Sequence, residues 1–176
     1  MKRTAAARLC ALALAMAFSA GPATVTPAAE TSTRTVPTDG DAKAIRALVR
    51  GLHEEIGRFF SSGKLEPVME YYRALRTYYP PYGEPQDAAA VRERLLSHAP
   101  RVQSFRTQVG PIQVHISGDL AIATCEVDEQ YLFDGNTGNE HLLSTYVLER
   151  RSGDWQIVHV HQSMKFSESG PAPPGK

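Results

Sequence analysis

Residues 144–163 read STYVLERRSGDWQIVHVHQS, and this stretch decides the fold class. Two runs rich in β-branched and aromatic residues flank the turn Ser152-Gly153-Asp154, which predicts two antiparallel strands joined by a tight hairpin. Side chains alternate along a strand, so the second run has two distinct faces. One predicted face carries Trp155, Ile157, His159 and His161, and the other carries Val158, Val160 and Gln162.

The chain from Pro100 to this hairpin has the same β-like character. The runs at 102–117 and 119–133 are separated from each other and from the hairpin by turns centred on Gly118 and Gly135. We therefore predict a four-stranded antiparallel meander in the second half of the chain.

The first half has a helical period instead. Apolar residues recur every three or four positions between 45 and 60, after the cap-type residue Thr38 and before the break Ser61-Ser62-Gly63. A short helix is predicted over 64–75, a Pro-Gly loop over 77–86, and a third helix after the cap residue Asp87. Three helices followed by a meander predict an α+β fold.

The chain begins with a pattern typical of a secretory signal peptide. Basic residues precede an apolar run at 9–18, and small residues follow it. We predict a signal peptide over 1–20, cleaved near Ala20 or alternatively near Ala29, a flexible leader over 21–38, a folded domain over 39–166 and a disordered tail over 167–176. The apolar run is short for a membrane span. The mature protein is therefore predicted to be periplasmic or secreted, without an integral membrane span.

Composition narrows the partners. The formal net charge of zero disfavours nucleic acid, because phosphate binding needs a basic excess. Removal of the signal peptide leaves Cys125 as the single cysteine, so no intramolecular disulfide is expected. Its neighbours on the same predicted face are alanine and valine, which predicts a small core residue there.

The quoted hairpin, together with SGDLAIAT at 117–124, PPYGEP at 80–85 and the long amphipathic helix, resembles the SnoaL-like branch of the nuclear transport factor 2-like superfamily. The last two strands are also similar to the association domain of calcium/calmodulin-dependent kinase II. The resemblance implies a cone-shaped, curved antiparallel sheet wrapped by three N-terminal helices, an internal pocket, and a homodimer. The family includes isomerases, polyketide cyclases and dehydratases, as well as domains that only bind or oligomerise, so the fold does not fix the function.

The resemblance also implies which residues face the pocket. The strand positions that line the pocket of the kinase domain correspond to Val158, Val160 and Gln162 in this sequence. Three basic residues of that pocket correspond to Asp128, Tyr146 and Gln162. None of these is basic here, which favours a neutral or cationic ligand over a carboxylate.

Asp128 and Glu126 share one predicted strand face and are candidates for acid/base work, since burial would raise a carboxyl pKa toward the useful range. Tyr146, Tyr72 and Tyr78 are candidate hydrogen-bond donors to a developing oxyanion or to a ligand. The competing interpretation is that both carboxylates are solvated at an exposed strand end and that the tyrosines serve as aromatic packing.

His159 and His161 would lie about 6.6 Å apart by strand rise, a spacing at which two histidines can share a metal. A usual catalytic site needs a third ligand, which the sequence does not fix. We therefore predict structural histidines, no metal and no cofactor.

The resulting hypothesis is an exported domain that binds a small, mostly apolar molecule in the cone. One alternative is an isomerase or cyclase, similar to ketosteroid isomerases or polyketide cyclases, that transfers a proton through Asp128 with Tyr146 as donor. The other is an oligomerisation or protein-binding module with a vestigial cavity.

Overall fold

The computed structural model describes residues 38–165. The predicted signal peptide, the predicted leader up to residue 37 and the predicted tail lie outside these residues. Among the described helices, none is long and apolar enough to cross a membrane.

The long first helix, α1 (Asp39–Ser62), begins and ends where its sequence pattern predicts. Thr38 and Asp41 form a capping box, in which the Thr38 side chain accepts a hydrogen bond from the Asp41 amide and the Asp41 carboxylate accepts one from the Thr38 amide. The helix ends at Gly63, whose φ of 73° lies in the left-handed region that favours glycine. Its buried face consists of Ile45, Val49, Leu52, His53 and Phe59.

The other two predicted helices are also present. They are α2 (Glu66–Tyr71) and α3 (Ala88–His98), and a 3₁₀ turn at Ala99–Arg101 follows α3. The Asp87 side chain caps α3 by accepting a hydrogen bond from the Ala90 amide at 2.8 Å.

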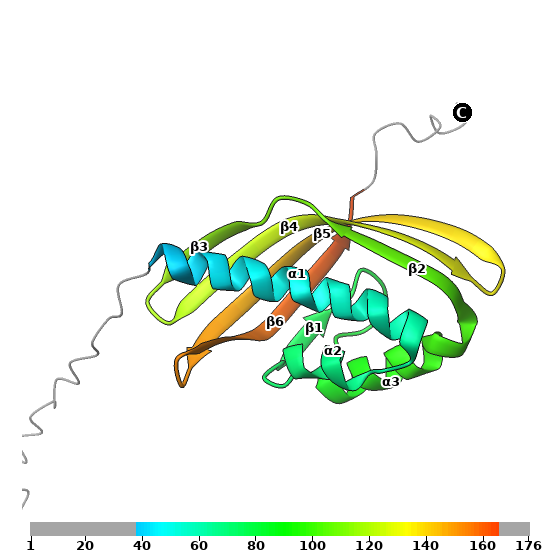
Figure 1. The fold of residues 1–176 in the computed structure, drawn as a ribbon, viewed down its shortest axis with the longest axis horizontal. Coiled ribbons are helices and arrows are strands. Elements are labelled where there is room, and N and C mark those ends of the chain that lie inside the picture. The colour runs from blue at the N-terminus through cyan, green and yellow to red at the C-terminus, as the bar shows by residue number, and fades with distance from the viewer. Residues whose placement is uncertain (1–37, 166–176) are drawn as a thin grey trace, which may run out of the picture. The chain divides into compact units, whose positions relative to one another are not determined.

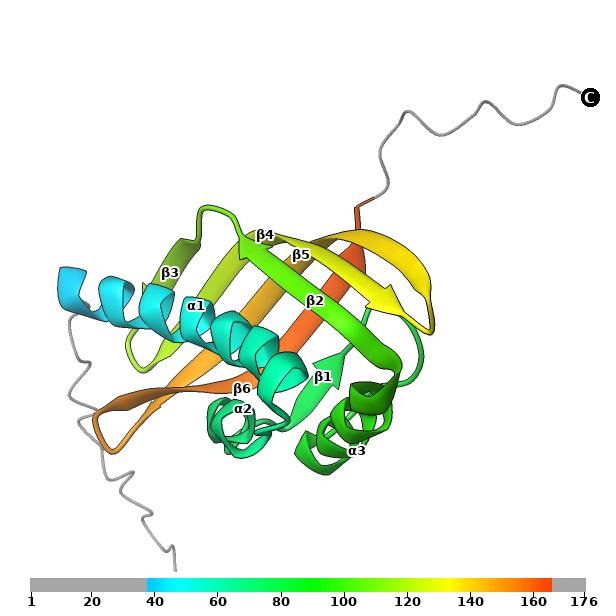
Figure 2. The same cartoon turned by 45° about the vertical axis from the view of Figure 1, so that its right-hand side comes forward.

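The sheet has six strands and is mixed. Its strands are β1 (Thr77–Tyr79), β2 (Val102–Val109), β3 (Gln113–Ser117), β4 (Leu120–Phe133), β5 (Asn136–Arg151) and β6 (Asp154–Met164). The order is β1-β6-β5-β4-β2, and β3 pairs with β4 beyond the end of β2. The curved, unclosed sheet places its concave side over α1, with α2 and α3 near one end (Figures 1 and 2). The predicted α+β fold class is confirmed.

Two details of the meander differ from the sequence prediction. The predicted single strand over 102–117 is divided into β2 and β3 at Gly110-Pro111, because proline has no amide to donate to β4. Residues 77–79 of the predicted loop form β1, which pairs parallel to β6. This pairing depends on a partner about 80 residues away in the chain, with Thr77 opposite His159.

A β-bulge in β6 corrects the predicted faces of that strand. Leu148 pairs with Ile157 but the preceding residue Val147 pairs with His159, so Val158 is the extra residue. Ile157 is therefore buried on the concave side with Trp155, whereas the two histidines that follow point to the outer side. The prediction that all four share one face is wrong, because the bulge reverses the alternation in mid-strand.

Candidate functional site

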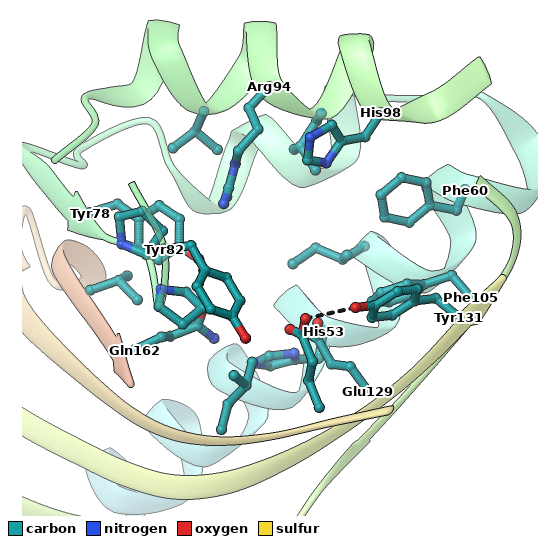
Figure 3. Close-up of a pocket in the computed structure, with 18 of the residues that line it drawn as sticks. His53, Phe60, Tyr78, Tyr82, Arg94, His98, Phe105, Glu129, Tyr131 and Gln162 are labelled. Atoms are coloured by element: carbon teal, nitrogen blue, oxygen red, sulfur yellow. Dashed lines mark hydrogen bonds between the residues drawn. The ribbon is translucent and has the colours of Figure 1, made fainter. Parts of the chain in front are cut away.

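The concave side of the sheet encloses a cavity of about 390 Å³. Strands β4, β5 and β6 form its floor, and α1, α3 and the loop at 80–82 cover it (Figure 3). Its lining comprises His53, Ile56, Phe60, Tyr72, Tyr78, Pro80, Pro81, Tyr82, Val91, Arg94, Leu95, His98, Val102, Phe105, Glu129, Tyr131, Phe133, Glu140, Leu142, Tyr146, Val160 and Gln162. Most of these are aromatic or aliphatic, and a few polar groups are set among them, as in small-molecule sites.

Glu129 on β4 is the most perturbed carboxyl group of the cavity. Its pKa is raised from 4.5 to about 7, chiefly by burial and also by the neighbouring Glu140, while the Arg94 guanidinium acts in the opposite direction. A carboxyl group with this pKa exchanges protons readily near neutral pH.

Glu140 on β5 is held by a phenol. The Tyr131 hydroxyl donates a hydrogen bond to its Oε1 at 2.7 Å, the contact drawn in Figure 3. This bond, with burial, raises the pKa of Tyr131 to about 12, so the phenol stays protonated. Glu140 is thereby fixed beside Glu129 as a hydrogen-bonded carboxylate, and the two acids have different surroundings.

A histidine and a tyrosine meet deeper in the cavity. His53 Nε2 lies 2.6 Å from the Tyr146 hydroxyl, and His53 Nδ1 lies 3.3 Å from Thr107 Oγ1. Burial lowers the pKa of His53 to about 4, so the ring is neutral at pH 7 and has one donor and one acceptor. In one tautomer, Thr107 donates to Nδ1 and Nε2–H donates to Tyr146, which leaves the phenol proton free to point into the cavity.

A second chain of hydrogen bonds crosses from β1 to β5. The Tyr78 hydroxyl donates to Gln162 Oε1 at 2.5 Å, and Gln162 Nε2 donates to Ser144 Oγ at 3.1 Å. All three residues are buried, so this chain holds the short strand β1 against the sheet and fixes the amide of Gln162.

Five of the eight residues predicted from sequence line this cavity: Tyr72, Tyr78, Tyr146, Val160 and Gln162. Val158 is the bulge residue; it is buried but does not belong to the lining. Any role of these side chains in binding or catalysis stays a prediction.

The predicted position of Asp128 and Glu126 at the cavity is wrong. Both lie on the outer face of the sheet, where Asp128 Oδ1 is 2.5 Å from His141 Nδ1 and Glu126 Oε2 is 3.0 Å from His141 Nε2. Lys165 Nζ also contacts Glu126, at 2.7 Å. Strand alternation explains the error, since the inward residues of β4 are the odd-numbered ones and the carboxyl group that enters the cavity is Glu129.

The sequence contained a signal for Glu129 that the prediction did not use. Ala121, Ala123, Cys125 and Val127 are all buried, and the same parity leads directly to Glu129. His53 and Arg94 had a weaker signal, because each lies three or four positions from apolar residues of its helix, Val49 and Ile56 for His53 and Val91 for Arg94.

The histidines of β6 lie outside the cavity. His159 and His161 flank the ring of Tyr79, with ring centroids 5.6 and 6.3 Å away. Within residues 38–165, no group of three or more His, Cys, Asp or Glu side chains has the geometry of a metal site.

Comparison with known proteins places the chain in a family. The model of the SnoaL-like domain family matches residues 49–167. No curated protein matches the chain.

Several solved structures share the fold. A hexachlorocyclohexane dehydrochlorinase from Novosphingobium barchaimii superposes with a TM-score of 0.61 and 16% identity over 78% of this chain and 100% of its own. A protein of the NTF2-like family from Streptomyces avermitilis, provisionally described as a dehydratase, gives 0.62 and 16% over 73% and 99%. A Xanthomonas campestris protein, provisionally described as a calcium/calmodulin-dependent kinase II association domain, gives 0.59 and 18% over 74% and 92%. At these identities the likeness shows the fold alone.

Proposed function

The chain belongs to the SnoaL-like family of the NTF2-like superfamily, and we propose that its cavity binds a small, largely apolar molecule on which Glu129 performs proton transfer. One observation carries the proposal: a carboxyl group with a pKa of about 7 lies in an aromatic cavity of about 390 Å³. A general base works best when its pKa is near the working pH, and removal of water by the apolar walls strengthens its interaction with a bound ligand. A hexachlorocyclohexane dehydrochlorinase and a protein provisionally described as a dehydratase occur among the structural relatives, which is compatible with a reaction that begins with proton removal.

The other polar groups have complementary parts in the proposed reaction. Removal of a proton next to a carbonyl makes an enolate, whose oxygen needs a hydrogen-bond donor. Tyr146 supplies that donor when His53 Nε2–H donates to its oxygen and Thr107 donates to His53 Nδ1. The abstracted proton rests on Glu129 and returns to the ligand at a second carbon, which is an isomerisation, or the ligand expels a leaving group, which is an elimination.

Isotope exchange tests the proton transfer without knowledge of the natural substrate. A panel of small cyclic and aromatic ketones is incubated in D₂O with the protein, and loss of the α-proton signal is followed by NMR. We expect exchange above the buffer rate with the wild type, loss of that excess with Glu129→Gln, and retention with Asp128→Asn, whose side chain is the neighbouring carboxylate on the outer face. No catalysed exchange of any ketone, or equal exchange by Glu129→Gln, would contradict the assignment.

Simple binding without turnover is the second candidate, and the same cavity supports it. The ketone exchange experiment separates the two functions. A protein that only binds the ketone does not accelerate exchange of its α-protons, whereas an enzyme does. A vestigial cavity would be filled by large side chains, and the open volume of about 390 Å³ speaks against it.

We also propose that the protein is exported and forms a homodimer through the outer face of the sheet. Leu120, Ile122 and Leu143 are exposed there by 53%, 46% and 42%. Sedimentation of Leu143→Glu should show dissociation, whereas Leu96→Glu, at an exposed leucine on α3, should leave the dimer intact. N-terminal sequencing of protein from fractionated cells tests export, and an uncleaved chain in the cytoplasm would contradict it.

A further inference from the structure

One arginine enters the cavity without a carboxylate partner. Arg94 lies on the face of α3 that also carries Val91, Leu95 and His98, all of which line the cavity. Figure 3 shows its side chain extending from the helix toward the open space beside Tyr78 and Tyr82. Its guanidinium carbon lies 4.7 Å from the centroid of the Tyr78 ring.

Arg94 makes no direct contact with a carboxylate within residues 38–165, although its charge acts on Glu129 from a distance. No ion pair of Arg94 occurs among these residues, and its buried Nε has no hydrogen-bond partner there. Two other arginines of the same region are paired, Arg92 with Glu66 at 2.9 Å and Arg101 with Asp134. A buried donor without a partner is costly, so a ligand acceptor that reaches this Nε would remove that cost.

The two carboxyl groups of the cavity are not partners of Arg94. Glu140 accepts its hydrogen bond from Tyr131, and neither Glu129 nor Glu140 forms an ion pair with Arg94. A guanidinium above an aromatic ring presents its remaining N–H groups in a planar fork, which matches the two oxygens of a carboxylate. With two protein carboxyl groups already present, a ligand with a single negative charge suits the site better than a phosphate dianion.

We propose that Arg94 is a specificity residue that binds a carboxylate of the ligand, so that the cavity selects small apolar monocarboxylic acids over neutral analogues. This reverses the expectation of a neutral or cationic ligand, because the cation comes from α3 and not from the strand positions compared with the kinase domain. The inference rests on the proposed ligand cavity but not on proton transfer by Glu129. A contact between Arg94 and the ligand carboxylate would place the charged end of the acid at α3 and its apolar body along the aromatic wall.

Matched ligands test the selectivity in the wild-type protein. Calorimetric titration compares phenylacetic, 3-phenylpropanoic and cyclohexylacetic acids, as carboxylates at pH 8, with their amides and with the corresponding primary amines. We expect at least one acid to bind about tenfold or more tightly than its amide, the size of effect that a charge-assisted bidentate contact gives. If no acid exceeds its amide, or if an amine binds best, the proposal is overturned.

Variants assign the effect to Arg94. Arg94→Gln should bring the ratio of acid to amide affinity near one, Arg94→Lys should retain part of it, and Arg92→Gln, at the paired arginine on the same helix, should leave it unchanged. An unchanged ratio in folded Arg94→Gln would refute the assignment, and if that variant does not fold, an unchanged ratio in Arg94→Lys would do so. The ratio should persist in Glu129→Gln, so failure of the proton-transfer proposal is read separately.

Discussion

Replacing Glu129 by glutamine should make the protein more stable at alkaline pH and not at acid pH. The folded-state pKa of about 7 exceeds the ordinary value of 4.5, so between these values the folded protein binds more protons at this site than the unfolded chain. The favourable contribution is complete below pH 4.5 and is lost as the pH rises through 7. At about 1.4 kcal/mol per tenfold change, the loss amounts to about 3 kcal/mol.

Urea denaturation of wild type and Glu129→Gln at half-unit steps from pH 4.5 to 8.5 measures this effect. The difference in unfolding free energy between the two proteins should move by about 3 kcal/mol in favour of the variant across the series, because contributions from other groups cancel in the difference. Glu93→Gln, at an exposed glutamate on α3, controls for loss of one carboxylate. A difference for Glu129→Gln that is flat in pH would refute the raised pKa and remove the main support for Glu129 as a base.

Three further predictions concern other parts of the domain. Burial lowers the pKa of His53 from 6.5 to about 4, so the wild type should lose about 3 kcal/mol from this group as pH falls across that interval, and urea titration of His53→Gln should lack the loss. Gly138→Ala would place a Cβ 2.2 Å from the Tyr131 ring, and we expect the ring to be displaced and stability to fall by about 1–3 kcal/mol in urea; an unchanged midpoint would contradict this contact. The pKa of Asp41 is lowered to about 2, chiefly by hydrogen bonds from the Thr38 amide and Trp155. Asp41 should therefore stabilise the fold above pH 4 and lose that effect toward pH 2. Thermal melts followed by fluorescence of Trp155, the single tryptophan, should show Asp41→Asn melting at a lower temperature than the wild type near pH 7 but not near pH 2.

The parts of the fold set by local rules were predictable from sequence. Helix periods, cap residues such as Thr38 and Asp87, and glycine turns act over a few residues, and they located α1, α3 and the hairpins. The strand β1 was missed because three residues in a proline-rich loop become a strand only through pairing with β6. The bulge at Val158 was invisible because Ile157 and Val158 are both apolar, so either register gives a plausible buried face.

The cavity was predictable in outline, but the predicted carboxyl group on β4 was wrong by one residue. Side chains on a strand alternate between two faces, so an alignment error of one residue moves a predicted residue to the opposite face. The turn at 134–135 allowed such an error, and Asp128 on the outer face was predicted in place of Glu129 in the cavity. Arg94 was not among the predicted residues, although it lies at helical spacing from Val91 and His98. An arginine at such a position usually extends its charged end into solvent, and the packing of α3 over the cavity shows that this one enters it.

Glu129 and His53 line the same cavity and respond to pH in opposite directions. On acidification from pH 7 to 4.5, protonation of Glu129 stabilises the folded state by about 3 kcal/mol, while the cost of keeping His53 neutral grows by a similar amount. The wild-type stability contributed by the pair should therefore be nearly flat, although each single variant has a steep slope of opposite sign. A flat wild-type profile is then the expected result of two perturbed groups, and the double variant should be flat as well. Over the same acidification Glu129 changes from a base to an acid, so the chemistry of the cavity can switch near pH 7 while the stability of the fold changes little.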